Sequence, residues 1–163
     1  MRYYDTFDSP WGGMLIAASD RGISGIYFNR QKYHPKRGAE WEHAPNNTHL
    51  KRAKKQLAEY FAGKRKEFDL ELDPAGSPFQ KRVWKAIAGV PYGETISYGE
   101  LARRSGFPEG ARAAGAATGR NPIGIVVPCH RIVGSNGKLT GYAGGLDKKR
   151  GLLALEAGER ELF

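Results

Sequence analysis

A short apolar run that ends in proline and cysteine sets the firmest limit on how this chain can fold. Residues 125–127 are all β-branched, Pro128 follows them, and Cys129 is the only cysteine among 163 residues. Runs of β-branched residues favour buried strands, and proline cannot donate to a strand ladder. We therefore predict a strand that ends at Pro128 and places Cys129 on a turn at the edge of the core.

The two residues after Cys129 bear on its reactivity. A protonated His130 and Arg131 would each favour the thiolate over the thiol if their charges lay beside the sulfur. The alternative is an inert, buried cysteine, which is the commoner state of a lone free cysteine. This stretch leaves both interpretations open.

Composition predicts one domain, or two small domains that share an interface. No apolar run approaches the length of a membrane span, and the N-terminal residues lack the apolar segment of a signal peptide. One cysteine excludes an internal disulfide and a Cys-based zinc site within one chain. We therefore expect a soluble protein in a reducing, intracellular setting.

The net charge is +9, and most of the excess lies in the second half. Residues 1–75 contain 13 Lys and Arg against 10 Asp and Glu, whereas residues 76–163 contain 13 against 7. No acidic residue occurs between Glu109 and Asp147, a tract that includes Cys129. Because carboxylates repel phosphates while Lys and Arg bind them with counterion release, this tract favours a nucleic-acid partner over a generally basic surface.

The first half is predicted to be a small α/β unit with no visible catalytic residue. His34, His43 and His49 match no zinc spacing, so we expect no metal there. The predicted elements are three strands, a loop, a helix with Thr48 as its N-cap, and an edge strand, at residues 2–8, 14–19, 23–29, 30–47, 48–62 and 68–72.

The second half is predicted to contain four helices joined by glycine-containing turns. Ser77-Pro78-Phe79-Gln80 combines an N-cap, a proline at the first helical position and a capping-box glutamine, so a helix begins here and ends before Gly89. A second capping box, Ser97 with Glu100, starts a helix that runs to about Ser105. The other helices are predicted at residues 111–118 and 147–157, and the pair between 97 and 118 has the shape of a helix-turn-helix.

Two further segments have open interpretations. Apart from Arg112 and Thr118, residues 111–118 are alanine and glycine. Small side chains permit close backbone approach to a DNA minor groove, but a tightly packed core helix has the same composition. Residues 134–145 are rich in glycine and lack the P-loop pattern, so they are expected to cradle phosphate or to form a flexible wall beside Cys129, not to bind a nucleoside triphosphate.

The adjacency of histidine and cysteine does not establish contact between them, because neighbouring residues of an extended chain face opposite sides. A turn or a bridging water would be needed for His130 to take a proton from Cys129. Glu156 is a carboxylate that could then orient the imidazole. These residue types fit a cysteine hydrolase as well as a thiolate that reacts only once.

Taken together, the motifs of residues 78–158 resemble, in order and spacing, the O6-alkylguanine-DNA alkyltransferase family, also called methylated-DNA–protein-cysteine methyltransferases. The resemblance of the first half is loose. The motifs that carry it are Phe79-Gln80, Val83-Trp84, Tyr92-Gly93-Glu94-Thr95-Ile96-Ser97-Tyr98, Arg112-Ala113-Ala114-Gly115-Ala116-Ala117, Asn121-Pro122, Pro128-Cys129-His130-Arg131, Gly141-Tyr142-Ala143-Gly144-Gly145 and Leu152-Leu153-Ala154-Leu155-Glu156.

The resemblance implies an α/β + α fold. Residues 1–75 would form a small RNase H-like α/β domain. Residues 76–163 would form a mainly helical winged-helix or helix-turn-helix domain that binds DNA and carries the alkyl acceptor.

The function implied by the resemblance is DNA repair by direct, stoichiometric transfer of an alkyl group. The group would pass from O6-alkylguanine, and also O4-alkylthymine, in duplex DNA to Cys129 after base flipping through the minor groove. Each molecule would react once, and no cofactor is expected, because the substrate brings the transferred group. The partner is double-stranded DNA and not a membrane. We expect a monomer in solution, with cooperative assembly on DNA left open, in the cytoplasm near the nucleoid, or in the nucleus of a eukaryote.

The resemblance also implies a role for each site residue. Cys129 would attack as the thiolate, His130 would act on it through water, and Glu156 would orient His130. Tyr98 would hydrogen-bond the purine, and Asn121 would brace the turn that carries Cys129. The implied DNA-binding residues are Arg112, which would fill the space of the flipped base, and Tyr98, Ala111, Ala113, Gly115, Thr118 and Arg120. The implied substrate pocket consists of Tyr142, Ala143, Gly144, Pro128 and Arg131.

The chain departs from some relatives in two places. Human-type enzymes have serine where this chain has Ala143, so backbone N–H groups would have to replace the hydroxyl contact to O6. Relatives with a structural zinc use cysteines in the first domain, and this chain has none there, so we predict no metal.

Three rival functions remain as hypotheses. Alkyltransferase-like lesion binders lack the cysteine, so the presence of Cys129 argues against that class. A cysteine hydrolase would use Cys129, His130 and Glu156 repeatedly, with no need for Arg112. A helix-turn-helix transcription factor would need base-reading side chains that residues 111–118 lack.

Overall fold

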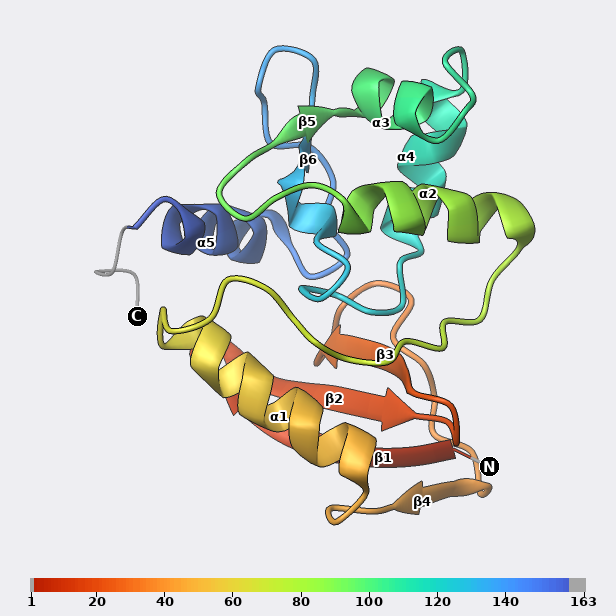
Figure 1. Ribbon diagram of the computed structural model, residues 1–163, viewed down its shortest axis with the longest axis vertical. Coiled ribbons are helices and arrows are strands. Elements are labelled where there is room, and N and C mark those ends of the chain that lie inside the picture. The colour runs from red at the N-terminus through yellow and green to blue at the C-terminus, as the bar shows by residue number, and fades with distance from the viewer. Residues whose placement is uncertain (1, 159–163) are drawn as a thin grey trace.

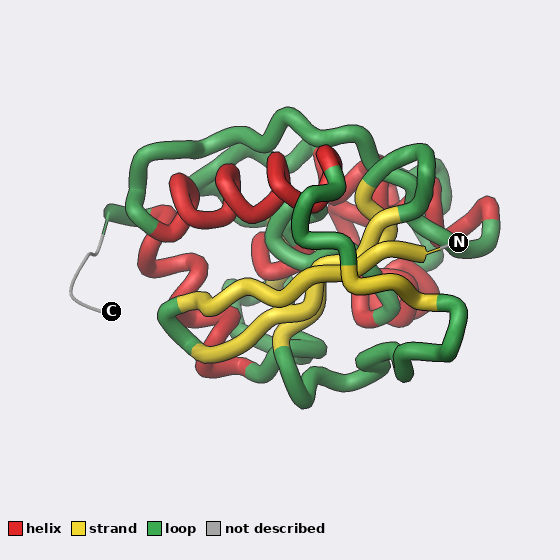
Figure 2. Tube along the Cα trace, turned by 90° about the horizontal axis from the view of Figure 1, so that it is seen from below, coloured by secondary structure: helices red, strands yellow, loops and turns green. Residues whose placement is uncertain are grey.

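The computed structural model describes residues 2–158, and its first half is a four-stranded sheet with one helix across it (Figure 1). The strand order is β3-β2-β1-β4; β1, β2 and β3 are antiparallel neighbours, and β4 runs parallel to β1. Seen from below, the strands form one layer (Figure 2). The elements of this half are β1 (Arg2–Ser9), β2 (Gly12–Ala18), β3 (Ile23–Phe28), β4 (Trp41–His43) and α1 (Thr48–Phe61).

Three predictions for this half need correction. The segment predicted as a loop contains β4, which pairs with β1. The N-cap of α1 is Asn47 and not Thr48, because the Asn47 side chain accepts a hydrogen bond from the Leu50 N–H at 3.2 Å. Residues 68–72 form only one isolated bridge, between Leu72 and Ile23.

The side chain of Gln56 explains why residues 68–72 do not form a strand. Its Oε1 accepts from the Asp69 N–H at 2.8 Å, and its Nε2 donates to the Asp69 carbonyl at 2.9 Å. Both backbone groups of Asp69 are therefore bonded to a side chain of α1 and not to a neighbouring strand. Backbone polar groups need one partner, and a side chain can supply it as well as a strand can.

The second half is mainly helical, as the capping patterns predicted. Ser77 caps α2 with both bonds of the capping box, and its proline lies in the first turn. Ser97 caps α3, but Glu100 does not complete a box, because it pairs with Arg103 and Arg104, which lower its pKa to about 2. The elements are α2 (Pro78–Ala88), β5 (Ile96–Ser97), α3 (Tyr98–Arg104), α4 (Ala111–Gly119), the 3-10 helix η1 (Cys129–Arg131), β6 (Ile132–Val133) and α5 (Leu146–Glu156).

The predicted strand before Cys129 is wrong. Residues 124–126 form a turn in which Ile125 has φ of +70°, and the strand of this region, β6, follows the cysteine and pairs with β5. The apolar side chains of residues 125–127 account for the error: Ile125 and Val127 are buried, but burial does not distinguish a strand from a turn. Positive φ is a genuine outlier for a β-branched residue, and such strain gathers near functional sites.

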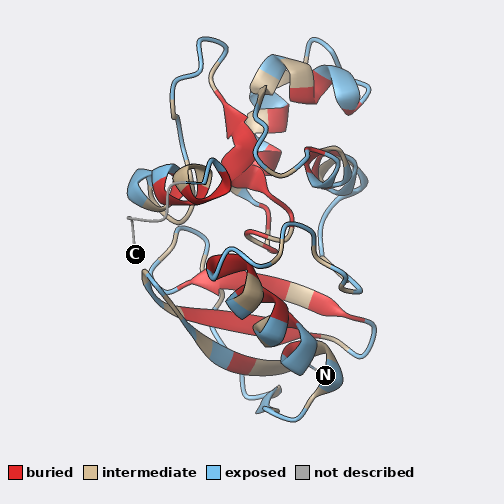
Figure 3. Cartoon of the chain, turned by 60° about the vertical axis from the view of Figure 1, so that its left-hand side comes forward, coloured by how far each residue is buried: buried red, intermediate tan, exposed pale blue. Residues whose placement is uncertain are grey.

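One continuous hydrophobic core joins the two halves. Buried residues lie on β2 and β3 and on the central segments of the second half (Figure 3). The free edge of β3 faces the turn before Cys129: the Ile26 N–H donates to the Pro122 carbonyl at 2.8 Å, and the Gly124 N–H donates to the Ile26 carbonyl at 3.1 Å. The sheet of the first half therefore supports the segment that carries the cysteine. Within residues 2–158, no helix has the length and apolar character that crossing a membrane requires.

Candidate active site

A cavity of about 830 Å³ lies in the second half, with Cys129 in its lining and with Lys32 and Tyr33 of the first half at its wall. Cys129 begins η1 and is 8% exposed, so it is a buried part of the cavity wall. The lining comes from α2, α3, α4, the glycine-rich segment before α5 and the loop after β3; it consists of Lys32, Tyr33, Ser77, Phe79, Gln80, Tyr98, Ala113, Gly115, Ala116, Ala117, Thr118, Gly119, Arg120, Cys129, Gly141, Tyr142 and Ala143.

Asn121 holds the turn that precedes Cys129. Its Nδ2 donates to the Val127 carbonyl at 2.8 Å, and its Oδ1 accepts from the Ile123 N–H at 3.0 Å. The amide thus bonds both ends of the turn while the side chain stays buried. Burial raises the pKa of the Cys129 thiol, while Asn121 and the charge of Lys149 act in the opposite direction. The thiol therefore needs a base to become a strong nucleophile at neutral pH.

His130 is fully buried and has one free ring nitrogen. Its Nε2 lies 2.7 Å from Glu156 Oε2, and within residues 2–158 its Nδ1 has no hydrogen-bond partner. Burial lowers the pKa of His130, so the imidazole is neutral at neutral pH, although Glu156 opposes the shift. A carboxylate on Nε2 fixes the proton there, which leaves a lone pair on Nδ1. The residue next to Cys129 is thus a neutral base with an unused acceptor.

Glu156 is the centre of a buried hydrogen-bond network. Oε2 lies 2.6 Å from the Tyr60 hydroxyl and 2.9 Å from Arg131 Nη2, and Oε1 lies 2.8 Å from Arg131 Nε and 3.2 Å from the Gly93 N–H. Burial alone would raise the pKa of Glu156, but the hydrogen bonds from His130, Arg131 and Tyr60 lower it far below its usual range. The carboxylate therefore stays charged and accepts from His130 at any pH near neutrality.

Arg131 lies elsewhere than the sequence suggested. Its guanidinium makes a bidentate pair with Glu156 and donates through Nη1 to the Val90 carbonyl at 2.7 Å. Since all these groups are buried, Arg131 neither faces the thiol as a free cation nor lines the cavity. The planar guanidinium can donate to both oxygens of one carboxylate at once, which accounts for the position of Arg131 beside Glu156.

The cation whose charge acts on the Cys129 thiol is Lys149, a residue that the sequence analysis did not single out. It is fully buried, and Nζ donates to the carbonyls of Ile132, Thr140 and Gly141 at 2.6, 2.8 and 3.2 Å. Burial lowers the pKa of Lys149 to about 8, and the charge of Cys129 opposes the shift. Lys149 lies three residues before Leu152 and seven before Glu156, a spacing that places all three on one face of α5. This spacing could have predicted from the sequence that Lys149 is buried.

Tyr98 begins α3 and faces the cavity. Its hydroxyl donates to the Thr140 carbonyl at 3.2 Å, the same oxygen that Lys149 contacts. Burial raises the pKa of Tyr98, so the phenol keeps its proton at neutral pH. A protonated hydroxyl in the cavity wall is available to donate to a bound base.

The residues predicted for the substrate pocket divide into two groups. Tyr142 and Ala143 line the cavity, whereas Pro128 and Gly144 are not among its lining residues. A Cβ at Gly144 would lie 2.8 Å from Tyr142 Cε2 and 3.0 Å from Phe28 Cδ2, so only glycine fits between these rings. Gly144 therefore lets the Tyr142 segment pack against β3.

Helix α4 has two distinct faces. Ala114, Ala117 and Thr118 are buried, and the Trp84 Nε1–H of α2 donates to the Ala117 carbonyl at 2.8 Å. The Thr118 hydroxyl donates to the Ala114 carbonyl at 2.7 Å, so it points along the helix and not outward. The opposite face carries exposed Arg112 and Ala113, with Ala111 and Gly115 partly exposed. Core packing therefore describes one face of this alanine-rich helix, while the other face is exposed.

The first half supplies part of the cavity wall, which no pattern in the sequence predicted. The Lys32 N–H donates to the Ala143 carbonyl at 2.9 Å, and the Tyr33 ring lies 3.8 Å from the guanidinium carbon of Arg120. Arg120, predicted to bind DNA, is thus exposed but stacked on an aromatic ring. In the described residues, no group of three His, Cys, Asp or Glu side chains is arranged to hold a metal.

Comparisons with known proteins match the chain along nearly its whole length. Residues 2–74 match the family model of the 6-O-methylguanine DNA methyltransferase ribonuclease-like domain, and residues 78–158 match that of the 6-O-methylguanine DNA methyltransferase DNA binding domain. The methylated-DNA–protein-cysteine methyltransferase of Mycolicibacterium paratuberculosis is 52% identical over 153 residues, which are 94% of this chain and 91% of the relative. The one of Methanosarcina acetivorans is 48% identical over 154 residues, 94% and 97% of the two chains.

The same relationship is visible among solved structures. The crystal structure of Mycobacterium tuberculosis OGT in complex with DNA superposes with a TM-score of 0.87 at 46% identity, covering 96% of this chain and 94% of that one. The two-part architecture, a ribonuclease-like first half and a DNA-binding second half, is therefore the fold of this chain.

Proposed function

The chain belongs to the 6-O-methylguanine DNA methyltransferase family and is a methylated-DNA–protein-cysteine methyltransferase; from this premise we propose that it removes an alkyl group from O6 of guanine in duplex DNA by transferring it irreversibly to Cys129, once per protein molecule. The same chemistry extends to O4-alkylthymine. The observation that carries the proposal is the neutral, buried His130, bound to Glu156 on one side and adjacent to the cavity-lining Cys129.

The proposed reaction is a single in-line displacement. The Cys129 thiol loses its proton through a water to Nδ1 of His130, and Glu156 stabilises the imidazolium that forms. The sulfur then bonds to the alkyl carbon as the bond from that carbon to O6 breaks. Guanine keeps the electron pair and takes one proton from the Tyr98 hydroxyl. The proton that the thiol lost to His130 then returns through water to the tyrosinate, so His130 and Tyr98 both regain their starting state. The thioether is stable, so the protein is consumed and no cofactor takes part.

The positive charge of Lys149 supports the same step. It favours the thiolate of Cys129, and its bonds to the carbonyls of Thr140 and Gly141 hold the segment that carries Tyr142. The backbone around Ala143 then supplies the contacts to O6 that a serine hydroxyl makes in some relatives. Preorganised groups of this kind cost no rearrangement during the reaction.

For DNA binding, we propose that α3 and α4 act as the helix-turn-helix of a winged-helix domain spanning residues 76–163, of which 159–163 lie outside the described residues. The small side chains on the exposed face of α4 permit close approach to the minor groove, and exposed Arg112 fills the space of the flipped nucleotide. Residues 1–75 form the other domain. The protein would act as a monomer in the compartment that holds the DNA.

The test is transfer of a labelled methyl group from O6 of guanine in duplex DNA. We expect label on the protein at one equivalent per chain, and none with Cys129→Ala. Arg112→Ala should slow the repair of duplex more than the reaction with free O6-benzylguanine, because only the duplex requires base flipping. The proposal fails if the intact protein takes up no label.

A further inference from the structure

The first half of the chain reaches the catalytic network through one side chain. Tyr60 lies near the end of α1, is fully buried, and places its hydroxyl 2.6 Å from Glu156 Oε2. The same oxygen lies 2.7 Å from Nε2 of His130. One carboxylate oxygen thus separates a residue of the ribonuclease-like half from the imidazole.

We propose that Tyr60 is a positioning residue, whose hydrogen bond to Glu156 fixes the carboxylate and sets how strongly it attracts the proton on His130. The proposal rests on the function assigned above, in which His130 is the base for Cys129. It gives the first half a part in the reaction beyond supporting the fold.

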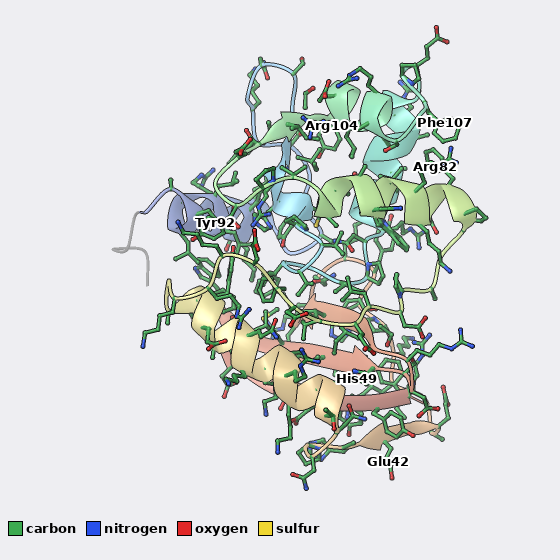
Figure 4. The ribbon with its side chains drawn as sticks, in the orientation of Figure 1. Glu42, His49, Arg82, Tyr92, Arg104 and Phe107 are labelled. Atoms are coloured by element: carbon green, nitrogen blue, oxygen red, sulfur yellow. The ribbon has the colours of Figure 1, made fainter. Side chains whose placement is uncertain are left out.

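The orientation of Tyr60 is fixed by its neighbours. Its ring makes edge contacts with Phe61 and Tyr92, at centroid distances of 5.5 and 6.1 Å, and a tilted contact with Phe68 at 5.4 Å. Tyr92 lies between α1 and α5 (Figure 4). Because the ring is held on three sides, the hydroxyl has a defined direction. A buried hydroxyl without a partner would be costly, and a carboxylate is the strongest acceptor available to it.

The charge around Glu156 shows why one neutral donor matters. Arg131 of η1 pairs with both oxygens, and the Gly93 N–H adds a neutral bond. Tyr60 of α1 adds a second neutral hydrogen bond, from its hydroxyl to Oε2. The remaining titratable groups that act electrostatically on His130 or Glu156, or stand beside them, are Tyr92, Tyr142, Cys129 and Lys149.

Removal of the Tyr60 hydroxyl has a definite direction of effect. Without that donor, the carboxylate keeps more of its negative charge for His130 and stabilises the imidazolium, so the pKa of His130 rises. The reaction needs neutral His130, so the rising limb of its pH profile moves to higher pH. If the limb shifts by about 0.5–1 pH unit, the rate at a fixed pH on the limb falls about three- to tenfold, because the fraction of neutral His130 falls by that factor.

The experiment uses the full chain with Tyr60→Phe and, as matched control, Tyr27→Phe. Tyr27 is a buried tyrosine of β3 in the same half, and its hydroxyl has no hydrogen-bond partner in residues 2–158. Rates with O6-benzylguanine are measured from pH 5 to 9, and the His130 ring nitrogens are titrated by NMR. We expect both the pH limb and the pKa of His130 to rise in Tyr60→Phe and to stay at wild-type values in Tyr27→Phe.

A second variant covers the case in which Tyr60→Phe folds poorly. Fluorotyrosine at position 60 keeps the ring and the hydroxyl but is a stronger donor, so it should move the pKa of His130 downward. A pKa of His130 that is unchanged in both variants, whatever their stability, would overturn the proposal. The NMR titration needs no substrate, so loss of alkyl transfer by the wild type would contradict the proposed function and leave this test intact.

Discussion

Within residues 2–158, each half of the molecule buries one carboxylate, and the two differ in their surroundings. Asp5 on β1 is 4% exposed, but its partners reach solvent: the side chain of His43 is 55% exposed and that of Lys54 is 37% exposed. The carboxylate of Glu156 and the rings and guanidinium that bind it are almost wholly buried. Water screens the first pair and is kept from the second.

This difference separates a structural ion pair from one that can control chemistry. Burial raises the pKa of Asp5, but hydrogen bonds from Lys54 and His43 lower it overall, as hydrogen bonds do for Glu156. Only Glu156, however, fixes a neutral histidine beside a cysteine. An insulated carboxylate keeps its charge and geometry when DNA binds, whereas the surroundings of Asp5 change with salt.

The largest expected effect is the loss of the cation that pairs with Glu156. Arg131→Met leaves a buried carboxylate without its counter-ion, so the free energy of unfolding should fall by about 3–5 kcal/mol. Arg103→Met is the matched control: its pair with Glu100 is exposed, and Arg104 remains, so the loss should stay below about 1 kcal/mol. Urea denaturation of both variants measures the difference. Equal losses would show that the Glu156 network is not insulated.

Removal of Lys149 should have the next largest effect. Lys149→Met removes the ammonium donor from the carbonyls of Ile132, Thr140 and Gly141, of which that of Thr140 keeps the Tyr98 hydroxyl, and should lower the free energy of unfolding by about 1–3 kcal/mol. It should also raise the pKa of the Cys129 thiol, since a neighbouring positive charge is lost, and slow methyl transfer. Thiolate absorbance against pH and single-turnover rates test both points. In the neighbouring control, Lys148→Met, an unaltered thiol pKa is expected, because that ammonium lies over the ring of Phe28.

Acid should destabilise the protein through the second half first. The pKa of His130 is lower in the folded chain than its ordinary value of 6.5, so the unfolded chain binds the proton more readily and stability declines as pH falls below 6.5. The pKa of Glu156 is also lowered, so a further loss begins below its ordinary value of 4.5. Urea midpoints from pH 8 to 4 measure this slope. In Glu156→Gln the part below pH 4.5 should become shallower, and an unchanged slope there would count against the assignment.

The smallest expected effect concerns Asp5. Asp5→Asn keeps its volume and loses an ion pair whose partners are partly in water, so the cost should be about 1 kcal/mol or less. Raising the salt concentration should weaken the wild-type pair and narrow the gap between the two proteins. Methyl transfer should be unaffected. A large loss of transfer in this variant would erase the contrast between the two carboxylates.

Most of the second half could be predicted from the sequence because the residues that begin and end its helices act locally. Ser77, Ser97 and the glycines after each helix act within a few residues of where they stand, so the helix ends follow from them. The family resemblance added the residues of the site. In contrast, the turn at Ile125 depends on Asn121 and on the edge of β3, and no local pattern distinguishes it from a strand.

What the sequence missed depends on contacts between distant residues. Tyr60 is 96 positions from Glu156 and reads as one more apolar residue on the buried face of α1. Tyr33 and Lys32 lie in a polar loop with no period, yet they reach the cavity wall. Lys149 was not singled out from the sequence, although α5 buries it completely. The charge of a residue and the spacing of apolar residues indicate which side of a helix faces the core. They do not indicate which distant segment packs against that side.

The mass of the intact protein after reaction with excess methylated duplex tests the central claim most directly. If Cys129 is an acceptor that reacts once, every chain gains one methyl group, the gain maps to the peptide containing Cys129, and loss of O6-methylguanine stops at one equivalent per chain. Continued loss of O6-methylguanine from the DNA with no change in protein mass would contradict the account and would indicate a hydrolase that turns over.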